Sequence, residues 1–354
     1  MRVVHVHRMR GIGGSERHLL TLLPALGERG VDVAFIGLDD PAWDAADFYR
    51  ALAVPALRLR SARDVDPLLL ARLLRSQRAD VVHTHLVHAD LYGGLAAKLR
   101  GAKLVSTKHN DDPFRRGPFR HVERRLARMA DRIVTITDAL RDFTVEHAGV
   151  DEAKVQTIHY GLDTLPASWG VNPPDDVAAG ARVLLSTSRL TAQKGIDVAI
   201  RALPQLPADT VLVVLGDGPE RSRLEALAHE LGVEQRVFLL GRVPDVASWL
   251  RRATLYVHPA RWEGFGLAVL EAMHASLPVV ATRASSLPEL VVDGVTGRLV
   301  PVDDPRALAA AIAQALDEPQ LGVAGRDRAA SEFSVARMAD SHAALYATLA
   351  SASS

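Results

Sequence analysis

The feature that most constrains the fold is an alternation of short β-rich runs with helical patterns, which occurs twice along the 354-residue chain. The runs are rich in Val, Ile and Leu, and the segments between them, such as Ser15–Glu28, repeat their apolar residues at helical spacing. Alternation of this kind indicates a parallel sheet covered by helices. The strands expected in the first series are Val3–His7, Val31–Ile36, Val81–Thr84, Leu104–Thr107 and Ile133–Ile136, and those in the second are Val183–Thr187, Val211–Leu215, Val237–Leu240, Leu255–Val257 and Val279–Ala281.

The two series are separated by residues 160–181, which are rich in Gly, Pro, Asp and Asn and lack periodicity. This segment is the best linker candidate. A chain of this length is too long to fold around a single hydrophobic core, so two domains of ordinary size are expected. We therefore predict an α/β protein with domains at 1–165 and 166–335, which places ligands near the C-terminal ends of the strands.

Composition excludes several classes of function. The chain has no cysteine, which rules out disulfides, thiolate metal sites and cysteine nucleophiles. A formal net charge of zero argues against bulk nucleic-acid binding. The N-terminus runs from Met1 into a strand-like segment without a signal-peptide pattern, and no apolar run reaches membrane-spanning length. We expect a cytoplasmic protein, with contact at the inner face of a membrane left open.

The stretch 258–271 contains two glutamates, Glu263 and Glu271, that stand eight residues apart. A β-rich run precedes it, a glycine-containing loop follows, and an apolar helical pattern begins at Leu267. A helix start offers N–H groups and a positive dipole end to an anion, and glycine lets the backbone approach a ligand closely. Because carboxylates are poor partners for phosphate, the glutamates should meet hydroxyls. A ligand with both a diphosphate and many hydroxyls, a nucleotide sugar, fits this unit.

The sequence Glu-Gly-Phe-Gly-Leu within this Glu-x7-Glu pattern resembles the donor-site signature of the retaining, glycogen-synthase-like GT-B glycosyltransferases of family 4. The resemblance covers nearly the whole chain and implies a GT-B fold, with two Rossmann-like α/β/α domains facing each other across a cleft. It also implies that a C-terminal helix, about 336–354, crosses back to pack on the first domain. The implied activity is retaining transfer of a sugar from a nucleoside-diphosphate sugar, UDP-sugar before GDP-mannose, to a hydroxyl acceptor. Glycolipid, cell-envelope polysaccharide or glycoconjugate synthesis is the expected setting.

The resemblance assigns roles in the second half of the chain. Glu263 is expected to bind hydroxyls of the donor sugar, and Glu271 those of the ribose. Arg189 and Lys194 would clamp the diphosphate, since arginine supplies a fork of donors and lysine a point charge; Ser188 stands where the family usually has glycine. Further donor contacts are expected at Gly216, Arg242, Val243, Phe265, Gly266 and Leu267. For the loops at Gly216 and Arg242, turn chemistry alone would also explain the residues.

In the first half, Gly13 and Gly14 open the first long helix, where the family often has Gly-Gly-x-Glu. Their backbone is expected to face the donor diphosphate or the acceptor. His109 follows the fourth expected strand and maps onto the family's active-site histidine near the transferred sugar. His83 and His85 have a spacing that suits no usual zinc site, so we interpret them as hydrogen-bonded strand-end histidines and assign no metal.

Two polar segments can be interpreted either as functional sites or as ordinary structural features. Asp64-Val65-Asp66 resembles a metal-binding motif of other glycosyltransferases, but it precedes a Leu-rich pattern and is interpreted as a helix start. In the Arg-rich segment 114–132, Val122, Leu126 and Met129 form an expected core stripe. Its arginines, Arg120, Arg124 and Arg128, are either a solvated face or a site of attraction to anionic lipid or a phosphorylated acceptor.

No side chain stands out as a nucleophile, which favours a front-face transfer assisted by the leaving diphosphate. Because Arg189 and Lys194 would neutralise the leaving group, no divalent metal or other cofactor is expected. Two alternatives remain. One is a GT-B epimerase or hydrolase that consumes the donor without an acceptor, and the other is a non-catalytic protein that binds nucleotide sugars.

Overall fold

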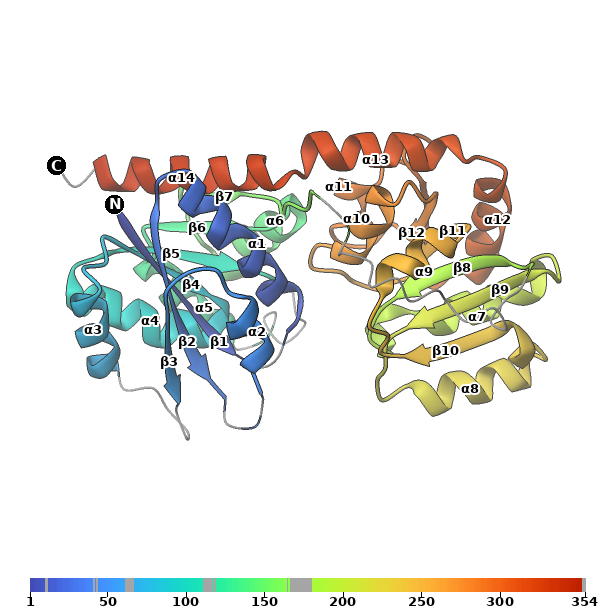
Figure 1. The fold of residues 1–354 in the computed structure, drawn as a ribbon, viewed down its shortest axis with the longest axis horizontal. Helices are drawn as coiled ribbons and strands as arrows, with labels where there is room; N and C mark the ends of the chain where they lie inside the picture. The colour runs from blue at the N-terminus through green and yellow to red at the C-terminus, as the bar shows by residue number, and fades with distance from the viewer. Residues whose placement is uncertain are drawn as a thin grey trace. The chain divides into compact units, whose positions relative to one another are not determined.

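The computed structural model describes residues 1–9, 12–40, 42, 44–60, 67–110, 117, 119–163, 165 and 180–351. The chain forms two compact units. Figure 1 colours the chain by residue number, so the last helix of the chain is red although it belongs to the same unit as the blue N-terminal part. Unit 1 comprises Met1–Gly161 and Phe333–Ser354, and unit 2 comprises Leu162–Glu332. Each unit is a parallel sheet with helices on its faces, so the predicted α/β architecture is confirmed. The predicted helix start at Asp64–Asp66 and most of the predicted linker lie outside the described residues.

The sheet of unit 1 has seven parallel strands in the order β3-β2-β1-β4-β5-β6-β7. Its central strands are Val-rich and buried on both faces, as expected for a parallel sheet between helix layers. The strand bounds are β1 (Arg2–Met9), β2 (Asp32–Asp39), β3 (Ala56–Arg60), β4 (Val81–His85), β5 (Lys103–Lys108), β6 (Arg132–Thr135) and β7 (Val155–Thr157). The edge strands β3 and β7 were not predicted.

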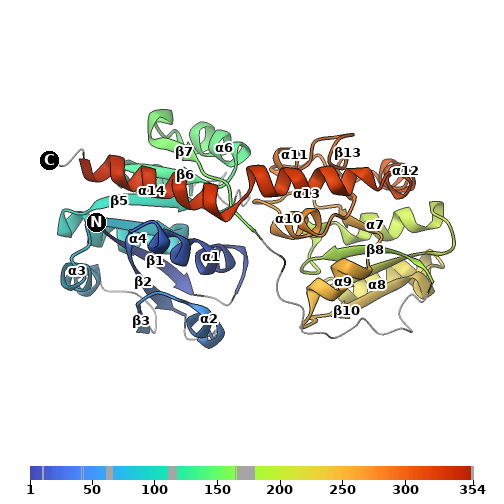
Figure 2. The ribbon, with the colours of Figure 1, turned by 45° about the horizontal axis from the view of Figure 1, so that its top comes forward.

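Two helix layers cover this sheet, because successive residues of each strand point to opposite faces. Val3 belongs to a core shared with α1 (Gly14–Glu28), α2 (Ala46–Ala51) and α14 (Val335–Ser351). Val4 belongs to the opposite core, shared with α3 (Pro67–Ser76), α4 (Leu86–Arg100), α5 (Arg120–Met129) and α6 (Asp138–Ala148). Figure 2 shows α14, the last helix of the chain, lying along unit 1 beside α1.

The predicted core stripe of α5 is partly wrong. Leu126 is buried, but Val122 is 44% exposed. The buried side of α5 runs through Glu123, Leu126 and Ala127. Val122 precedes the buried Glu123 by one residue. Because each residue of an α-helix is rotated by about 100° from the next, Val122 points away from the core.

The sheet of unit 2 has six parallel strands in the order β10-β9-β8-β11-β12-β13. The strands are β8 (Arg182–Thr187), β9 (Thr210–Leu215), β10 (Val237–Gly241), β11 (Leu255–His258), β12 (Val279–Thr282) and β13 (Arg298–Val300). The helices are α7 (Ile196–Ala202), α8 (Arg221–Glu230), α9 (Val246–Arg252), α10 (Leu267–His274), α11 (Leu287–Leu290), α12 (Pro305–Leu316) and α13 (Gln320–Glu332). A single 3-10 turn, η3 (Ala192–Lys194), precedes α7. Across the described residues of both units, no helix combines the length and apolarity needed to cross a membrane.

Candidate active site

The predicted donor residues Lys194 and Glu263 lie in the segments that follow β8 and β11, at the carboxyl edge of the sheet. The chain leaves β11 at His258, forms a loop, and enters α10 at Leu267. Gly266 is the residue before the helix and has a φ of 101°, a conformation that favours glycine. A side chain there would also crowd Leu290, since a Cβ would lie 2.9 Å from its Cδ1. The glycine in the motif is therefore needed to turn the chain into α10.

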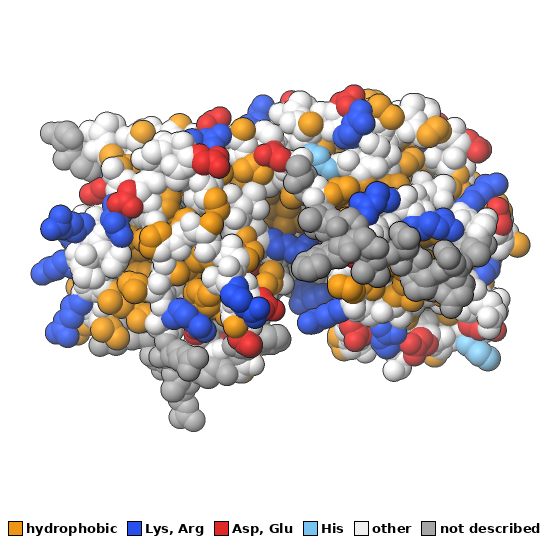
Figure 3. Space-filling view, in the orientation of Figure 1, with side chains coloured by type: hydrophobic (Ala, Val, Ile, Leu, Met, Phe, Trp, Pro, Cys, Tyr) orange, Lys and Arg blue, Asp and Glu red, His pale blue; other side chains and the backbone are white. Residues whose placement is uncertain are grey.

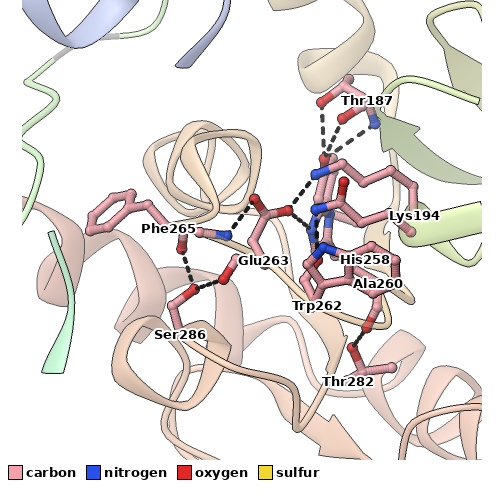
Figure 4. Close-up of polar contacts among 12 residues, drawn as sticks. Thr187, Lys194, His258, Ala260, Trp262, Glu263, Phe265, Thr282 and Ser286 are labelled. Carbon is pink, nitrogen blue, oxygen red and sulfur yellow. Dashed lines mark hydrogen bonds and ion pairs between the residues drawn. The ribbon is translucent and has the colours of Figure 1, made fainter. Parts of the chain in front are cut away.

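Glu263 lies in this loop and is held by two basic side chains (Figure 4). The Nζ of Lys194 lies 2.5 Å from its Oε2, and the Nε2 of His258 lies 2.9 Å from the same oxygen. Burial alone would raise the pKa of Glu263, but the charge of Lys194 and the hydrogen bond with His258 outweigh it and lower the pKa to about 2. Glu263 is therefore an ionised hydrogen-bond acceptor at neutral pH.

The backbone of the loop is fixed by side chains from other segments. Ser286 Oγ donates to the carbonyls of Glu263 and Phe265, at 3.0 and 3.1 Å. Gln193 Nε2 donates to the carbonyl of Trp262 at 3.0 Å, and Thr282 Oγ1 donates to that of Ala260. A loop held at four carbonyls presents Glu263 in a defined position before any ligand arrives.

Lys194 ends the 3-10 turn η3, which follows β8 and faces the glutamate loop. Gly195 has a φ of 62°, and a Cβ there would lie 2.0 Å from the carbonyl oxygen of Pro259. Arg261 joins the two segments, because its guanidinium binds both carboxylate oxygens of Asp197, at 3.0 and 2.9 Å, and the carbonyl of Ala192 at 2.6 Å. The lysine turn and the glutamate loop are thus one rigid assembly.

The other predicted donor residues lie near the same sheet edge. Arg189 lies two residues after the end of β8 and is exposed, and its guanidinium makes no hydrogen bond or ion pair with any described residue. Gly216 follows β9 with a φ of 136°, and its N–H donates to the carbonyl of Gly241 at 2.7 Å. Arg242 is exposed and follows β10, whereas Glu271 is 7% exposed within α10. The edge therefore combines an unpaired arginine, a lysine and two carboxylates.

Sequence reasoning missed the residues that support this site. His258, Gln193 and Ser286 were not predicted as partners of the glutamate loop. The role of His258 could have been predicted, because this residue ends β11 and begins the 258–271 stretch that contains both glutamates. The other two act from segments remote in sequence, which no local pattern reveals.

In unit 1, Gly13 and Gly14 stand at the start of α1. The N–H of Gly13 donates to the carboxylate of Glu16 at 2.9 Å, so this amide already has a partner inside the protein. Glu16 also accepts from Ser15 Oγ at 3.0 Å. The Gly-Gly-x-Glu segment therefore caps its own helix.

His109 lies at the end of a row of buried histidines on one face of the sheet of unit 1. Alternate residues of β1 and β4 point to this face, and the register pairs His5 with His83 and His7 with His85. These four side chains are fully buried, and His109, directly after β5, is 8% exposed. Sequence reasoning interpreted His83 and His85 as hydrogen-bonded and missed the matching pair on β1, although the His-x-His pattern occurs in both strands.

We define the histidine chain as His5, His83, His85 and His109 with the hydroxyl groups that join and end it. His109 Nδ1 contacts the hydroxyl of Tyr160, and its Nε2 lies 3.0 Å from His85 Nδ1. His85 Nε2 lies 2.9 Å from His5 Nδ1, and His5 Nε2 lies 3.5 Å from the hydroxyl of Tyr346. The same hydroxyl lies 2.6 Å from His83 Nδ1, and His83 Nε2 lies 2.6 Å from Thr107 Oγ1.

The histidine chain is built for hydrogen bonding rather than metal binding. Ring nitrogens of His5, His83 and His85 lie within 4.8 Å of one another, close enough to consider a metal. Each of their nitrogens already has a hydrogen-bond partner. The rings also stack, with interplanar angles of 13° to 37°, so their in-plane lone pairs do not converge on one point. This geometry supports the hydrogen-bonded interpretation.

Burial keeps the imidazoles of six buried histidines neutral. It lowers the pKa of His5 to about 3, with a further contribution from His342, and that of His342 to about 4. Burial also lowers the pKa of His7, His18, His83 and His85. His109, bonded at both ring nitrogens, is a fixed group at the end of this neutral row.

Comparisons with known proteins match both halves of the chain. The family model described as Glycosyltransferase Family 4 matches residues 12–164, and the one described as Glycosyl transferases group 1 matches residues 175–331. The chain is 30% identical over 343 residues to the alpha-maltose-1-phosphate synthase of Mycolicibacterium smegmatis, covering 83% of this chain and 86% of that protein. It is 28% identical to the lipopolysaccharide core biosynthesis glycosyltransferase LpsE of Rhizobium meliloti, covering 98% and 99%.

A solved structure of the same overall fold is that of Anabaena Alr3699/HepE in complex with UDP and glucose. It superposes with a TM-score of 0.84 at 23% identity, covering 98% of this chain and 100% of that one. At this level of identity the similarity establishes the arrangement of the backbone.

Proposed function

Because the chain belongs to glycosyltransferase family 4 and has its GT-B fold, we propose that it transfers a sugar, with retention of configuration, from a nucleoside-diphosphate sugar to a hydroxyl acceptor. The observation that carries this proposal is the assembly of Lys194 and ionised Glu263 at a sheet edge that also bears the unpaired Arg189. A UDP-sugar is our first choice of donor and GDP-mannose the second. The structural relative that binds UDP supports the first choice.

Each residue has a distinct role in this proposal. Arg189 and Lys194 bind the diphosphate, and Glu263 accepts hydrogen bonds from hydroxyls of the transferred sugar. Glu271, in the buried middle of α10, serves the ribose hydroxyls. In unit 1, the family resemblance proposes a role for His109 near the transferred sugar, and the contacts of this side chain with Tyr160 and His85 keep it in place.

The proposed reaction occurs on one face of the sugar. The bond from the anomeric carbon to the diphosphate breaks, and its electron pair leaves with the diphosphate. The acceptor oxygen bonds to the same face of that carbon, and its proton passes to the diphosphate. Glu263 is a poor nucleophile because its pKa is lowered to about 2, which favours this route over a covalent intermediate on that residue. Stabilising the leaving charge is then the main catalytic effect, without a divalent metal.

The acceptor is proposed to be a saccharide or lipid-linked hydroxyl in glycolipid or envelope polysaccharide synthesis. The relative named for lipopolysaccharide core biosynthesis supports this class. We place the enzyme in the cytoplasm, where a lipid-linked acceptor would be met at the inner face of the membrane through the Arg-rich segment 114–132.

A donor panel read by nucleotide release, with and without candidate acceptors, tests the proposal. Release that requires an acceptor supports transfer, release without one identifies a hydrolase or epimerase, and binding without release identifies a silent binder. Arg189→Ala and Lys194→Met should each lower turnover on the order of a hundredfold. Arg326→Ala, a change at an exposed arginine of α13, is the matched control and should leave turnover unchanged. Normal turnover by the double variant at Arg189 and Lys194 would refute the assigned roles.

A further inference from the structure

The outer surface of unit 1 beside the second helix layer differs from an ordinary solvated surface. We call it the α3–α4–α5 face and define it by the exposed residues of these three helices. α4 packs against α3 on one side and α5 on the other. Their inward residues, including Leu70, Leu74, Ala96 and Ala97, lie in the core against the sheet. The outward residues of the three helices therefore form one continuous surface.

Apolar side chains are concentrated on this face. Leu91, Leu95 and Leu99 repeat at every fourth residue of α4, which aligns them in a stripe along the helix. They are 38%, 40% and 58% exposed. Six of the thirteen large apolar residues that are exposed in the described chain belong to these helices, the others being Leu68, Leu69 and Val122. An exposed apolar cluster of this kind marks an interaction surface.

The charge on this face has one sign. The three helices contain two acidic residues, Asp90 and Glu123, which are 4% and 2% exposed and therefore do not contribute to the surface. Lys98 makes a long contact, 3.5 Å, with Asp131 in the turn after α5. The basic residues of the helices are Arg72, Arg75, Lys98, Arg100, Arg120, Arg124, Arg125 and Arg128. A solvated surface normally intersperses both signs, whereas this one combines leucine with arginine.

We propose that the α3–α4–α5 face docks unit 1 on an anionic lipid bilayer. A leucine stripe parallel to a helix axis, with arginines on either side, suits a helix that lies in the interface between headgroups and acyl chains. Cations near the surface add attraction to anionic headgroups. Figure 3 shows apolar side chains beside cations around α3, at the left of the view.

Charge complementarity favours lipid over other occupants. A second copy of this face would bring arginines against arginines, which opposes association. A small phosphorylated sugar would engage cations but would leave the leucine stripe exposed. A bilayer satisfies both features at once. The proposal extends the sugar-transfer function by specifying where the enzyme acts, and it does not depend on donor turnover.

Co-sedimentation of the full chain with vesicles tests the proposal, using phosphatidylcholine alone or mixed with phosphatidylglycerol. We expect binding to the mixed vesicles that weakens as salt is raised. The variant Arg120→Gln/Arg124→Gln/Arg128→Gln should bind on the order of a hundredfold more weakly, since each surface cation contributes roughly fivefold. The variant Leu91→Gln/Leu95→Gln/Leu99→Gln should bind at low salt but be released at moderate salt.

Unit 2 offers matched controls. Val292, Val295 and Val323 are exposed valines there, and changing them to Gln should leave vesicle binding unchanged. Equal binding to both kinds of vesicle, or an equal loss in the unit 2 control, would overturn the proposal. A dimer in light scattering that the leucine variant dissociates would show instead that the face joins two copies. Because every change is at an exposed residue, circular dichroism should show folded protein, and nucleotide release should persist if the transfer function is correct.

Discussion

Mild acid should destabilise unit 1 far more than unit 2, because of its buried histidines. Six of them have pKa values lowered chiefly by burial, whereas an unfolded histidine titrates near 6.5. The unfolded chain therefore binds more protons below that value. The stability that depends on neutral histidine is fully present above about pH 6.5 and is lost as pH falls toward the folded-state pKa.

The expected loss is a sizeable fraction of the stability of a domain. At about pH 5.5, one unit below the unfolded pKa, each histidine that stays neutral in the folded state costs about 1.4 kcal/mol. His5 and His342, with folded pKa values of about 3 and about 4, together account for about 3 kcal/mol. Burial also lowers the pKa of His7, His18, His83 and His85, which adds to this loss, against a typical free energy of unfolding of about 5–15 kcal/mol.

Hydrogen exchange read by mass spectrometry would measure this loss separately in each unit. Peptides from β1 and β4 should lose protection between about pH 7.5 and about pH 5.5, once rates are corrected for intrinsic exchange. Peptides from β8 and β9 should lose much less. His342→Leu removes one titrating group outside the histidine chain and should reduce the pH dependence of unit 1 by about 1.4 kcal/mol. His229→Leu, at an exposed position of α8, should not change it.

Two results would refute this reasoning. One is a change below about 1 kcal/mol in the opening free energy of unit 1 over that pH range. The other is an equally steep loss in unit 2. Either would mean that the imidazoles gain protons without opening the fold.

Three further predictions follow from the geometry of the two units. Donor binding, measured by calorimetry, should not weaken between about pH 7 and about pH 5 through Glu263, because a carboxylate with a pKa of about 2 stays ionised and loses its charge only well below that range. Gly195→Ala should lower the midpoint of thermal unfolding strongly, since its Cβ would meet a backbone oxygen at 2.0 Å. Gly232→Ala, where φ is similar but the space around the Cβ is open, should lower the free energy of unfolding by only about 1–2 kcal/mol. Asp90→Asn should lower the free energy of unfolding, measured in urea, by about 3–5 kcal/mol, because it leaves a buried lysine unpaired. Asp47→Asn, at an exposed ion pair, should lower it by less than about 1 kcal/mol.

The sequence predicted the central strands well, because strands buried on both faces are nearly continuous runs of Val and Leu. It missed β3, β7 and β13, which lie at sheet edges. β3 reads Ala-Leu-Arg-Leu-Arg with mostly exposed residues, and the other two have three residues each. Short edge strands have too little buried surface to leave a pattern distinct from that of a loop.

The residues of the site were predictable, but their mutual contacts were not. The motifs identified Lys194 and Glu263 as separate ligand groups, 69 residues apart. Their ion pair with each other, and the part of His258 in it, depend on how two turns meet at the sheet edge. The histidine chain likewise depends on the register of β1 and β4, which pairs His5 with His83. Both contacts are set by tertiary structure, which local spacing does not encode.

The histidine chain has a consequence for where its hydrogens can be. A neutral imidazole donates from one nitrogen and accepts at the other. Only two proton orders therefore keep every link from Tyr160 to Tyr346: one places the hydrogen of His109, His85 and His5 on Nε2, and the other places it on Nδ1. These three rings share one tautomer and can exchange it only together. His83 is joined to them through the hydroxyl of Tyr346, which can accept from both rings, so its tautomer is not fixed by theirs. Whether Tyr160 donates to His109 or accepts from it thereby dictates which nitrogen of His5 carries hydrogen.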